Sequence, residues 1–333
     1  MNSETTITDL KERTLQGYRI TKDEALMLSN IHDKEALYQA AGELRDAMTG
    51  TYFDTCSIIN ARSKKCSEDC KWCAQSTLYD TGVDAYELID EKECLEMAKR
   101  NAAHGINKFS FVTSGRALSD KNIDILCGYY ERIRKQVPIK LCASMGLLTK
   151  EQLLKLKKVG IMRYHCNLET SRNHFPNVCT THTFDEKIAT IHAVQEAGME
   201  VCSGGIIGMG ETMEDRIDMV LTLRELNVKS IPVNILNPVP GTPLEGTPPL
   251  TDEDILTTIA VFRFIHPDAY FRFAGGKTLI THIEEKAIKA GINSSIMGGM
   301  LTMAGTEIEK DVEKINKLGY VLDDKAEITP FWR

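Results

Sequence analysis

Residues 66–76 read Cys66-Ser67-Glu68-Asp69-Cys70-Lys71-Trp72-Cys73-Ala74-Gln75-Ser76. Three thiols fall within eight residues in a C-x3-C-x2-C pattern, directly after an apolar, β-like run at 52–61. Thiolates are the usual ligands of iron–sulfur clusters, and a cluster normally takes four ligands. Because the motif itself supplies only three, it predicts a 4Fe–4S cluster with one iron open to a substrate or cofactor.

Zinc, disulfides and chance clustering each account less well for the motif. Structural zinc takes four closed ligands, usually as two paired half-sites, and no second C-x2-C or H-x3-5-H pair follows downstream. A disulfide framework does not suit thiols so tightly spaced in a chain that we expect to be cytosolic. Chance clustering of core cysteines does not account for the polar residues that separate the thiols.

Length and composition limit the remaining possibilities. A chain of 333 residues is long enough for one large α/β barrel or two ordinary domains. The net charge of −7, without a long basic run, argues against nucleic acid as a partner. The polar, acidic start at 1–6 is unlike a signal peptide, and no apolar run approaches membrane-spanning length. We therefore expect no membrane association and a reducing, cytoplasmic location that keeps the cysteines available for metal.

The first 50 residues have a different pattern from the rest. Leucines and isoleucines recur at helical spacing between charges, and Thr21-Lys22-Asp23-Glu24 resembles a capping box. We expect residues 1–50 to form an N-terminal helical extension and residues 51–333 to form the main domain.

In the main domain, short apolar runs alternate with longer amphipathic stretches. The stretches at 151–159 and 184–197 are followed by Gly160 and Gly198, typical of helix ends. Eight strands with helices between them predict a (β/α)8 barrel, because the strand count favours closure over a doubly wound open sheet. We expect strands at 53–60, 107–114, 139–145, 162–168, 199–207, 229–236, 270–275 and 294–301.

A barrel predicts where the functional residues meet. Active sites of this architecture lie at the carboxyl ends of the strands. The cysteine motif follows the first strand, Asn167 and Glu169 close the fourth, and residues 208–211 follow the fifth. Segments far apart in the sequence should therefore meet on one rim.

The motif with Trp72 before its last cysteine resembles the signature of the radical S-adenosylmethionine (SAM) superfamily. The continuation at 73–76 is similar to that of biotin synthases, as are Tyr164-His165-Cys166-Asn167-Leu168-Glu169-Thr170-Ser171 and Val201-Cys202-Ser203-Gly204-Gly205-Ile206-Ile207-Gly208-Met209-Gly210-Glu211-Thr212. The similarity runs from about residue 50 to the region of Leu301.

The resemblance implies that Cys66, Cys70 and Cys73 hold the first cluster and that SAM binds its open iron. Three departures qualify the cofactor site: the segment at 111–115 lacks the usual Gly-Gly-Glu, Glu169 stands for Asp, and Lys187 stands for Arg. Lys keeps the charge of Arg without the bidentate fork. The implied cofactor-binding residues are Trp72, Thr113, Ser114, Asn167, Glu169, Lys187, Gly208 and Glu211.

Biotin synthases also resemble one another in an auxiliary cluster held by three cysteines and an arginine. Cys142, Cys202 and Arg272 match three of these positions, but Ser110 stands where the family has the remaining cysteine. Cys166 stands where the family has His, so we expect it to replace the missing ligand, although a buried core cysteine is the alternative. The nuclearity, 2Fe–2S or 4Fe-type, stays open. Four cysteines receive no role: Cys56, Cys94, Cys127 and Cys179.

The reaction implied is SAM-dependent radical insertion of sulfur into dethiobiotin to form biotin. The auxiliary cluster would supply the sulfur, and Asn167 and Arg272 would act as catalytic residues. The expected partners are an electron donor of the flavodoxin or ferredoxin type and a second copy of the chain. A methylornithine-type mutase or a hydrogenase-maturation enzyme would leave Cys142, Cys166, Cys202 and Arg272 without a joint purpose. An iron–sulfur carrier would need exposed, transferable ligands rather than a nucleotide-binding barrel.

Overall fold

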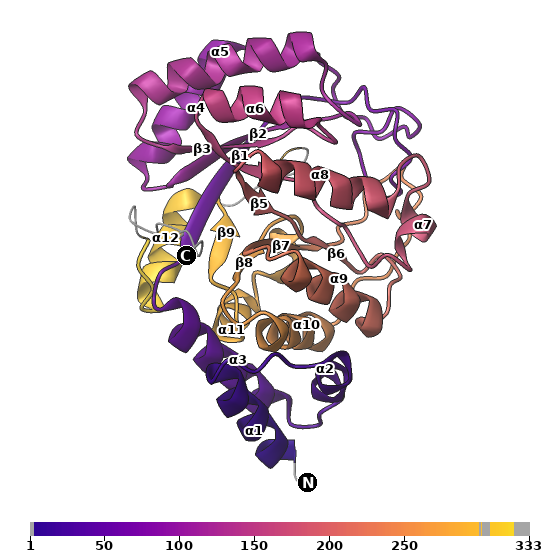
Figure 1. Cartoon of the computed structure of the whole chain (residues 1–333), viewed down its shortest axis with the longest axis vertical. Helices are drawn as coiled ribbons and strands as arrows, with labels where there is room; N and C mark the ends of the chain where they lie inside the picture. Colours follow the sequence, from indigo (N-terminus) through magenta and orange to yellow (C-terminus); the bar gives the residue numbers. More distant parts are fainter. Residues whose placement is uncertain (1–2, 300, 302–306, 323–333) are drawn as a thin grey trace.

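One closed sheet of parallel strands forms the centre of the computed structural model, which describes residues 3–299, 301 and 307–322 (Figure 1). The strand order is β5-β4-β3-β2-β1-β9-β8-β7-β6, and pairing of β5 with β7 closes the ring. Because β5 and β6 are two halves of one barrel position, the nine described strands fill eight positions. The predicted (β/α)8 barrel is confirmed.

The strands agree with the predicted ones to within a few residues, except at two places. Their bounds are β1 Asp54–Arg62, β2 Lys108–Thr113, β3 Lys140–Ser144, β4 Ile161–His165, β5 Glu200–Cys202, β6 Gly205–Ile207, β7 Ser230–Ile235, β8 Tyr270–Phe273 and β9 Ser294–Ile296. β9 is shorter than the predicted 294–301, of which residue 300 lies outside the described part.

The second difference is the break between β5 and β6. A Cβ at Gly204 would lie 1.9 Å from the Pro232 carbonyl oxygen, so only glycine fits this close approach. The Gly204 amide donates to Asn167 Oδ1 at 2.9 Å instead of to a neighbouring strand. The break therefore ties the fifth strand to the segment after β4.

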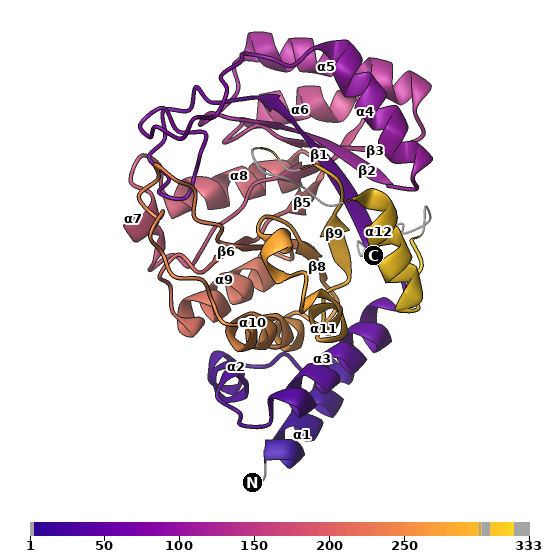
Figure 2. The same cartoon turned by 180° about the vertical axis from the view of Figure 1, so that it is seen from behind.

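Helices cover the outside of the barrel (Figures 1 and 2). Their bounds are α1 Ser3–Leu15, α2 Lys22–Ser29, α3 Lys34–Thr49, α4 Glu91–Ala103, α5 Asp120–Gln136, α6 Lys150–Lys158, α7 Phe175–Val178, α8 Phe184–Glu196, α9 Met213–Glu225, α10 Asp252–Ile265, the 3-10 helix η1 Lys277–Ile280, α11 Glu284–Lys289 and α12 Ile308–Lys317. No helix in the described ranges is long and apolar enough to cross a membrane.

Local signals set several helix ends. Capping boxes, in which a threonine side chain and an acidic or amide side chain satisfy each other's backbone amides, start five helices: at Thr21, Thr149, Thr183, Thr212 and Thr251. The capping box predicted at Thr21 is confirmed. Gly160 and Gly198 follow α6 and α8 with φ of +100° and +71°, a conformation that favours glycine.

The first three helices lie at one end of the molecule against α9, α10 and α11, as both views show (Figures 1 and 2). Tyr38 of α3 bonds through its hydroxyl to Thr257 Oγ1 of α10 at 3.1 Å. Arg45 of α3 is buried and donates to the carbonyls of Ile288 and Ile292. The helical extension predicted for the N-terminus is therefore packed onto the outer helices of the barrel.

Candidate active site

A cavity of about 340 Å³ occupies the inside of the barrel and its carboxyl-terminal rim. Its lining follows strand alternation: Cys56 and Ile58 of β1 and Arg163 and His165 of β4 face it, two residues apart in each strand. Trp72 and Cys73 line it from the motif loop. One cavity therefore connects the first cysteine motif with the inward residues of the strands.

The motif loop follows β1 and is held by its own hydrogen bonds. The Cys66 carbonyl accepts from the Thr77 amide at 2.8 Å, and the Cys73 amide donates to the Cys70 carbonyl at 3.0 Å. Burial raises the pKa of the Cys73 thiol to about 11, and the charges of Cys66 and Glu169 add to this effect. The three motif thiols thus share one neighbourhood, where a positive metal core would favour their thiolate forms.

The predicted cofactor residues after β4 lie on the same rim. Asn167 and Glu169 line the cavity, and Asn167 Nδ2 donates to Glu169 Oε2 at 3.1 Å. Glu169 has φ +74°, and its backbone pairs with Gly204 and Ile206 across the break in strand five. This backbone pairing holds the Glu169 side chain at the cavity wall.

Two further predicted residues have side chains suited to a ligand near this rim. The Lys187 ammonium lies close enough to Cys166, Glu169 and Cys70 for their charges to raise its pKa against the effect of burial. The Thr113 hydroxyl at the end of β2 is buried and has no hydrogen-bond partner among the described residues. Neither residue lines the cavity, so contact of these two groups with a cofactor stays a prediction.

The remaining predicted cofactor residues are engaged within the protein. Glu211 accepts from the Gly208 and Met209 amides at 2.7 and 2.6 Å and from Arg216 Nε at 2.7 Å. The Ser114 hydroxyl donates to the Lys64 carbonyl. Gly208, Glu211 and Ser114 do not line the cavity, so the geometry gives them the task of shaping the loops around it.

The structure places Cys56, Cys142 and Cys202 together with Arg272 along the cavity, deeper in the barrel than the motif loop. Interaction with the neighbouring Cys142 thiol lowers the pKa of Cys56 to about 7 and raises the pKa of Cys142 well above its usual range. Arg272 Nη1 donates to Cys202 Sγ at 3.3 Å. Burial raises the pKa of the Cys202 thiol, but a hydrogen bond from His165 and the charge of Arg272 outweigh burial and lower this pKa to about 6.

Cys166 is not part of this group, contrary to the sequence-based expectation. It lies one residue beyond His165, which faces the cavity, and it packs into the hydrophobic core instead. The groups whose charges affect its pKa are Lys187 and Glu169, on the rim, rather than the deeper cysteines. Cys56, for which we expected no role, lies with Cys142 and Cys202 along the cavity, where we expected Cys166 to lie.

Sequence reasoning also missed the charges that surround the deeper cysteines. Asp54 is buried and pairs with Lys108, with Arg163 at 3.4 Å and with Arg272 at 2.5 Å. Arg163 Nη2 is buried without a hydrogen-bond partner among the described residues, although Arg163 lines the cavity. Glu200 also pairs with Arg163, at 2.9 Å, so three cations meet two carboxylates and leave a small excess of positive charge at this end of the cavity. The only sequence signal was charged residues inside predicted strands.

This donor set fits an iron–sulfur cluster. Clusters carry net negative charge on thiolates and sulfide and are tuned by hydrogen bonds to sulfur. The deeper group offers three thiols, of which Cys56 and Cys202 have lowered pKa values and Cys142 a raised one. Cys202 is contacted by ring and guanidinium nitrogens of His165 and Arg272. Ser110 is beside Cys142 in the β2–β3 register and also lines the cavity, but its hydroxyl is a poor ligand for iron.

Comparisons with known proteins agree with this geometry. Residues 61–223 match the radical SAM superfamily, and residues 232–321 match the biotin and thiamin synthesis associated domain. A solved methylornithine synthase has a TM-score of 0.80 over 93% of this chain and 96% of its own at 19% identity, which shows the shared fold alone. A hydrogenase maturase has the same TM-score over 95% of this chain and 75% of its own at 18% identity.

A closed parallel barrel with a C-x3-C-x2-C loop after its first strand defines a radical SAM enzyme, with a 4Fe–4S cluster and SAM as its cofactors. The curated biotin synthase of Parabacteroides distasonis is 47% identical over 97% of this chain and 99% of its own. That of Clostridium botulinum strain Alaska E43 is 50% identical over 93% of this chain and 97% of its own. The chain belongs to the biotin synthase family.

Proposed function

We propose that this chain makes biotin by inserting sulfur into dethiobiotin at the cavity that joins its two groups of cysteines. The observation that carries the proposal is the shared lining: Cys73 bounds the cavity at the rim, and Cys56, Cys142 and Cys202 bound it deeper in the barrel. A substrate between the two groups would be exposed to radical chemistry from one side and to a sulfur donor from the other. Membership of the biotin synthase family supports the same reaction.

At the rim, Cys66, Cys70 and Cys73 would hold the 4Fe–4S cluster. When bound, this cluster with SAM supplies the reactive species that removes hydrogen from unactivated carbon. Asn167 and Glu169 offer an amide and a carboxylate to SAM or substrate from the cavity wall. Trp72 contributes an aromatic face, and Lys187 offers a positive charge near the motif.

Deeper in the barrel, Cys56, Cys142 and Cys202 would hold the auxiliary cluster that donates sulfur. Three thiolates leave one position that Arg272 or a small sulfur ligand can occupy. Arg272 is oriented by Ser294 Oγ at 2.8 Å and Ser230 Oγ at 2.9 Å, so its guanidinium stays beside Cys202. The excess positive charge nearby would stabilise a negative cluster in a site shielded from water.

The barrel interior also limits side reactions. A water-excluding cavity protects reactive intermediates from quenching by solvent. The lining carries more apolar than polar surface, from side chains such as Ile58, Val112 and Ile206. Dethiobiotin, which has a hydrocarbon tail and a polar ureido ring, suits a mostly apolar cavity with a few fixed amides such as Asn234 and Asn167.

Two partners belong to the proposal. An electron donor of the flavodoxin or ferredoxin type would reduce the rim cluster, and the chain would form a homodimer. All ten cysteines are free thiols, which fits a reducing cytoplasm. The structural likeness to methylornithine synthase rests on fold alone, and neither that activity nor a carrier function accounts for the deeper cysteine group.

The test compares two buried cysteines that the structure separates. Cys56→Ala should remove auxiliary iron from the anaerobically reconstituted chain and abolish biotin formation, because Cys56 is in contact with Cys142. Cys166→Ala should keep both, because its side chain packs into the core. Iron and sulfide per chain, Mössbauer spectra and biotin formed from dethiobiotin are the measurements.

A control separates the two clusters. Cys73→Ala should abolish 5′-deoxyadenosine formation from SAM while keeping the auxiliary iron. The proposal is wrong if Cys56→Ala retains full auxiliary iron and activity, or if Cys166→Ala loses both. It is also wrong if the wild-type chain cleaves SAM but leaves dethiobiotin unchanged with both clusters loaded.

A further inference from the structure

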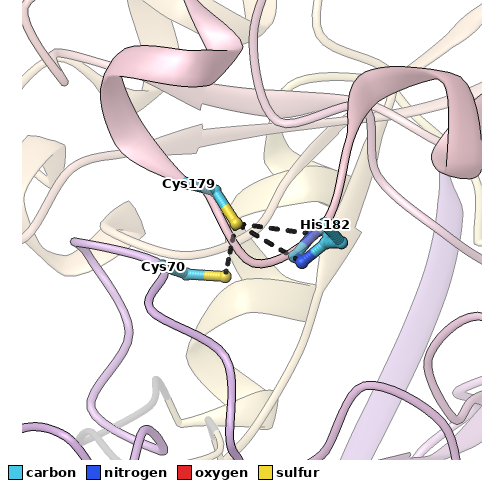
Figure 3. Close-up of side chains that lie close together, drawn as sticks. All are labelled: Cys70, Cys179 and His182. Atoms are coloured by element: carbon cyan, nitrogen blue, oxygen red, sulfur yellow. Dashed lines mark hydrogen bonds between the residues drawn. The ribbon is translucent and has the colours of Figure 1, made fainter.

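A second group of metal-binding side chains meets the motif loop away from the cavity. Cys179 and His182 lie between α7 and α8, and Figure 3 shows Cys179 facing both Cys70 and His182. Cys179 Sγ is 3.7 Å from Cys70 Sγ, 3.3 Å from His182 Nδ1 and 3.8 Å from His182 Nε2. One ligand atom from each of the three residues lies within 4.8 Å of the others.

The loop that carries Cys179 is fixed to the motif by further contacts. Asp69 Oδ1 accepts from the Thr180 and Thr181 amides at 2.9 and 3.1 Å. The Lys71 amide donates to the Val178 carbonyl at 3.0 Å. Cys70 and Cys179 are therefore held near each other by backbone contacts, independently of the thiols themselves.

The spacing matches that of ligands around one small ion. With metal–sulfur bonds of about 2.3 Å and metal–nitrogen bonds of about 2.0–2.1 Å, tetrahedral geometry puts two sulfurs about 3.8 Å apart and sulfur and nitrogen about 3.6 Å apart. The observed separations are 3.7 Å between the sulfurs and 3.8 Å from Cys179 Sγ to His182 Nε2. The His182 Nδ1 atom lies nearer to Cys179 Sγ, at 3.3 Å, so an ion bound to Nε2 requires a rotation of the imidazole ring.

Glu68 prepares the histidine for this role. Its Oε2 atom lies 2.6 Å from His182 Nδ1, which assigns the ring proton to Nδ1 and leaves the lone pair on Nε2. Glu68 is buried and also accepts from Thr181 Oγ1 at 2.8 Å. A carboxylate behind a histidine is the arrangement that orients metal-binding imidazoles in proteins.

We propose that Cys70, Cys179 and His182 bind one thiophilic divalent cation, such as Zn²⁺ or Fe²⁺, in the cluster-free chain. Two thiolates and a neutral imidazole suit such ions, and solvent would complete the tetrahedron. Because Cys70 also belongs to the C-x3-C-x2-C motif, this ion and the 4Fe–4S cluster would exclude each other. Only that exclusion rests on the proposed function; the ion site does not.

The experiment titrates Co²⁺ into the reduced, cluster-free full chain under anaerobic conditions. Tetrahedral thiolate-bound Co²⁺ has intense visible bands and sulfur-to-metal charge transfer, which report the ligands directly. Cys179→Ala and His182→Ala should each lose one equivalent of thiolate-bound Co²⁺ relative to the wild-type chain. Glu68→Gln should weaken that equivalent by about 10- to 100-fold, as loss of an orienting carboxylate does.

Cys66→Ala is the matched control, because it removes a motif cysteine that is outside the trio. Cys66→Ala should still bind the equivalent of Co²⁺ that Cys179→Ala and His182→Ala lose and that Glu68→Gln binds more weakly. Circular dichroism should show that each variant is folded. Equal Co²⁺ binding by Cys179→Ala and wild type would overturn the proposal, as would loss of the same equivalent in Cys66→Ala.

A second measurement separates this site from the proposed function. Zn²⁺ loaded beforehand should slow assembly of the 4Fe–4S cluster in the wild-type chain and should not slow it in Cys179→Ala. An equal delay in both proteins would show that the ion and the cluster do not compete through this site. A wild-type chain that binds the Co²⁺ equivalent but assembles no 4Fe–4S cluster would contradict the proposed function alone.

Discussion

At the scale of single residues, Asp54 has the largest electrostatic task. It begins β1, is 1% exposed, and faces Lys108, Arg163 and Arg272. Those three cations hold the pKa of the Asp54 carboxyl well below its usual range, against the effect of burial. The carboxylate thereby fixes Arg272 beside Cys202, so one buried anion positions the residue that we propose as an auxiliary ligand.

Asp54→Asn should therefore be strongly destabilising. Removal of one partner from a buried ionic group leaves uncompensated charge and costs about 3–5 kcal/mol. Asp124→Asn is the matched control, because its partner Lys155 is exposed and surface pairs contribute only about 0–1 kcal/mol. Urea unfolding of the two variants at neutral pH measures the difference, and similar losses would contradict the electrostatic role of Asp54.

The buried Asp54 carboxylate also makes the stability of the fold depend on pH. A carboxyl whose pKa is lowered in the folded state stabilises the fold above its unfolded pKa, near 3.9, and loses that contribution as the pH falls below it. The gap in unfolding free energy between wild type and Asp54→Asn should therefore shrink below about pH 4. A gap that stays constant down to pH 3 would indicate that loss of charge is not the cause.

At the scale of elements, the contact of α3 with α11 depends on a glycine. Gly42 is in the middle of α3, and a Cβ there would lie 2.1 Å from the Lys289 carbonyl oxygen at the end of α11. The two helices approach so closely only because the position has no side chain. Gly128 in α5 has no atom within 4 Å of the same added Cβ.

The two glycines should respond to alanine with opposite signs. Gly128→Ala should stabilise the chain by about 0.5–1 kcal/mol, because alanine is the better helix former. Gly42→Ala should destabilise it, because the clash with backbone outweighs the same helix preference. Thermal unfolding of the two variants is the measurement, and stabilisation by Gly42→Ala would show that α11 moves away at no cost.

At the scale of the whole molecule, the N-terminal helices cover part of α10, which solvent would otherwise reach. Every residue of α10 from Ile255 to Ile265 is buried. The helices α2 and α3 provide part of that cover, and α1 packs on α3. We propose that residues 1–50 are a structural cap on the barrel and fold with it as one unit.

The full chain should then unfold in a single calorimetric transition. Tyr38→Phe removes the buried bond to Thr257 and should lower the midpoint of that transition, at a cost of about 0.5–1.5 kcal/mol. Residues 51–333 alone should expose the α10 face and aggregate. Two transitions in the full chain, with only one of them moved by Tyr38→Phe, would instead show an independent N-terminal domain.

The sequence by itself determined the features that depend on neighbouring residues. The spacing of Cys66, Cys70 and Cys73, the capping box at Thr21 and the alternation of strands with helices are local, and the strand count was enough to predict a closed barrel. A turn or a helix cap forms from a few adjacent residues, so the short stretch of sequence that forms it is enough to predict it.

Only the tertiary structure decided which cysteines meet. Alternation along a strand puts the side chains of Cys56 and Ile58 on one face of the strand and those of His165 and Cys166 on opposite faces. Only the closed barrel determines which face points into the cavity. Cys70 and Cys179 are 109 positions apart, and no local pattern predicts that contact. Asp54, Lys108, Arg163 and Arg272 come from four strands, and their charges meet only because the closed barrel brings these side chains together in its interior.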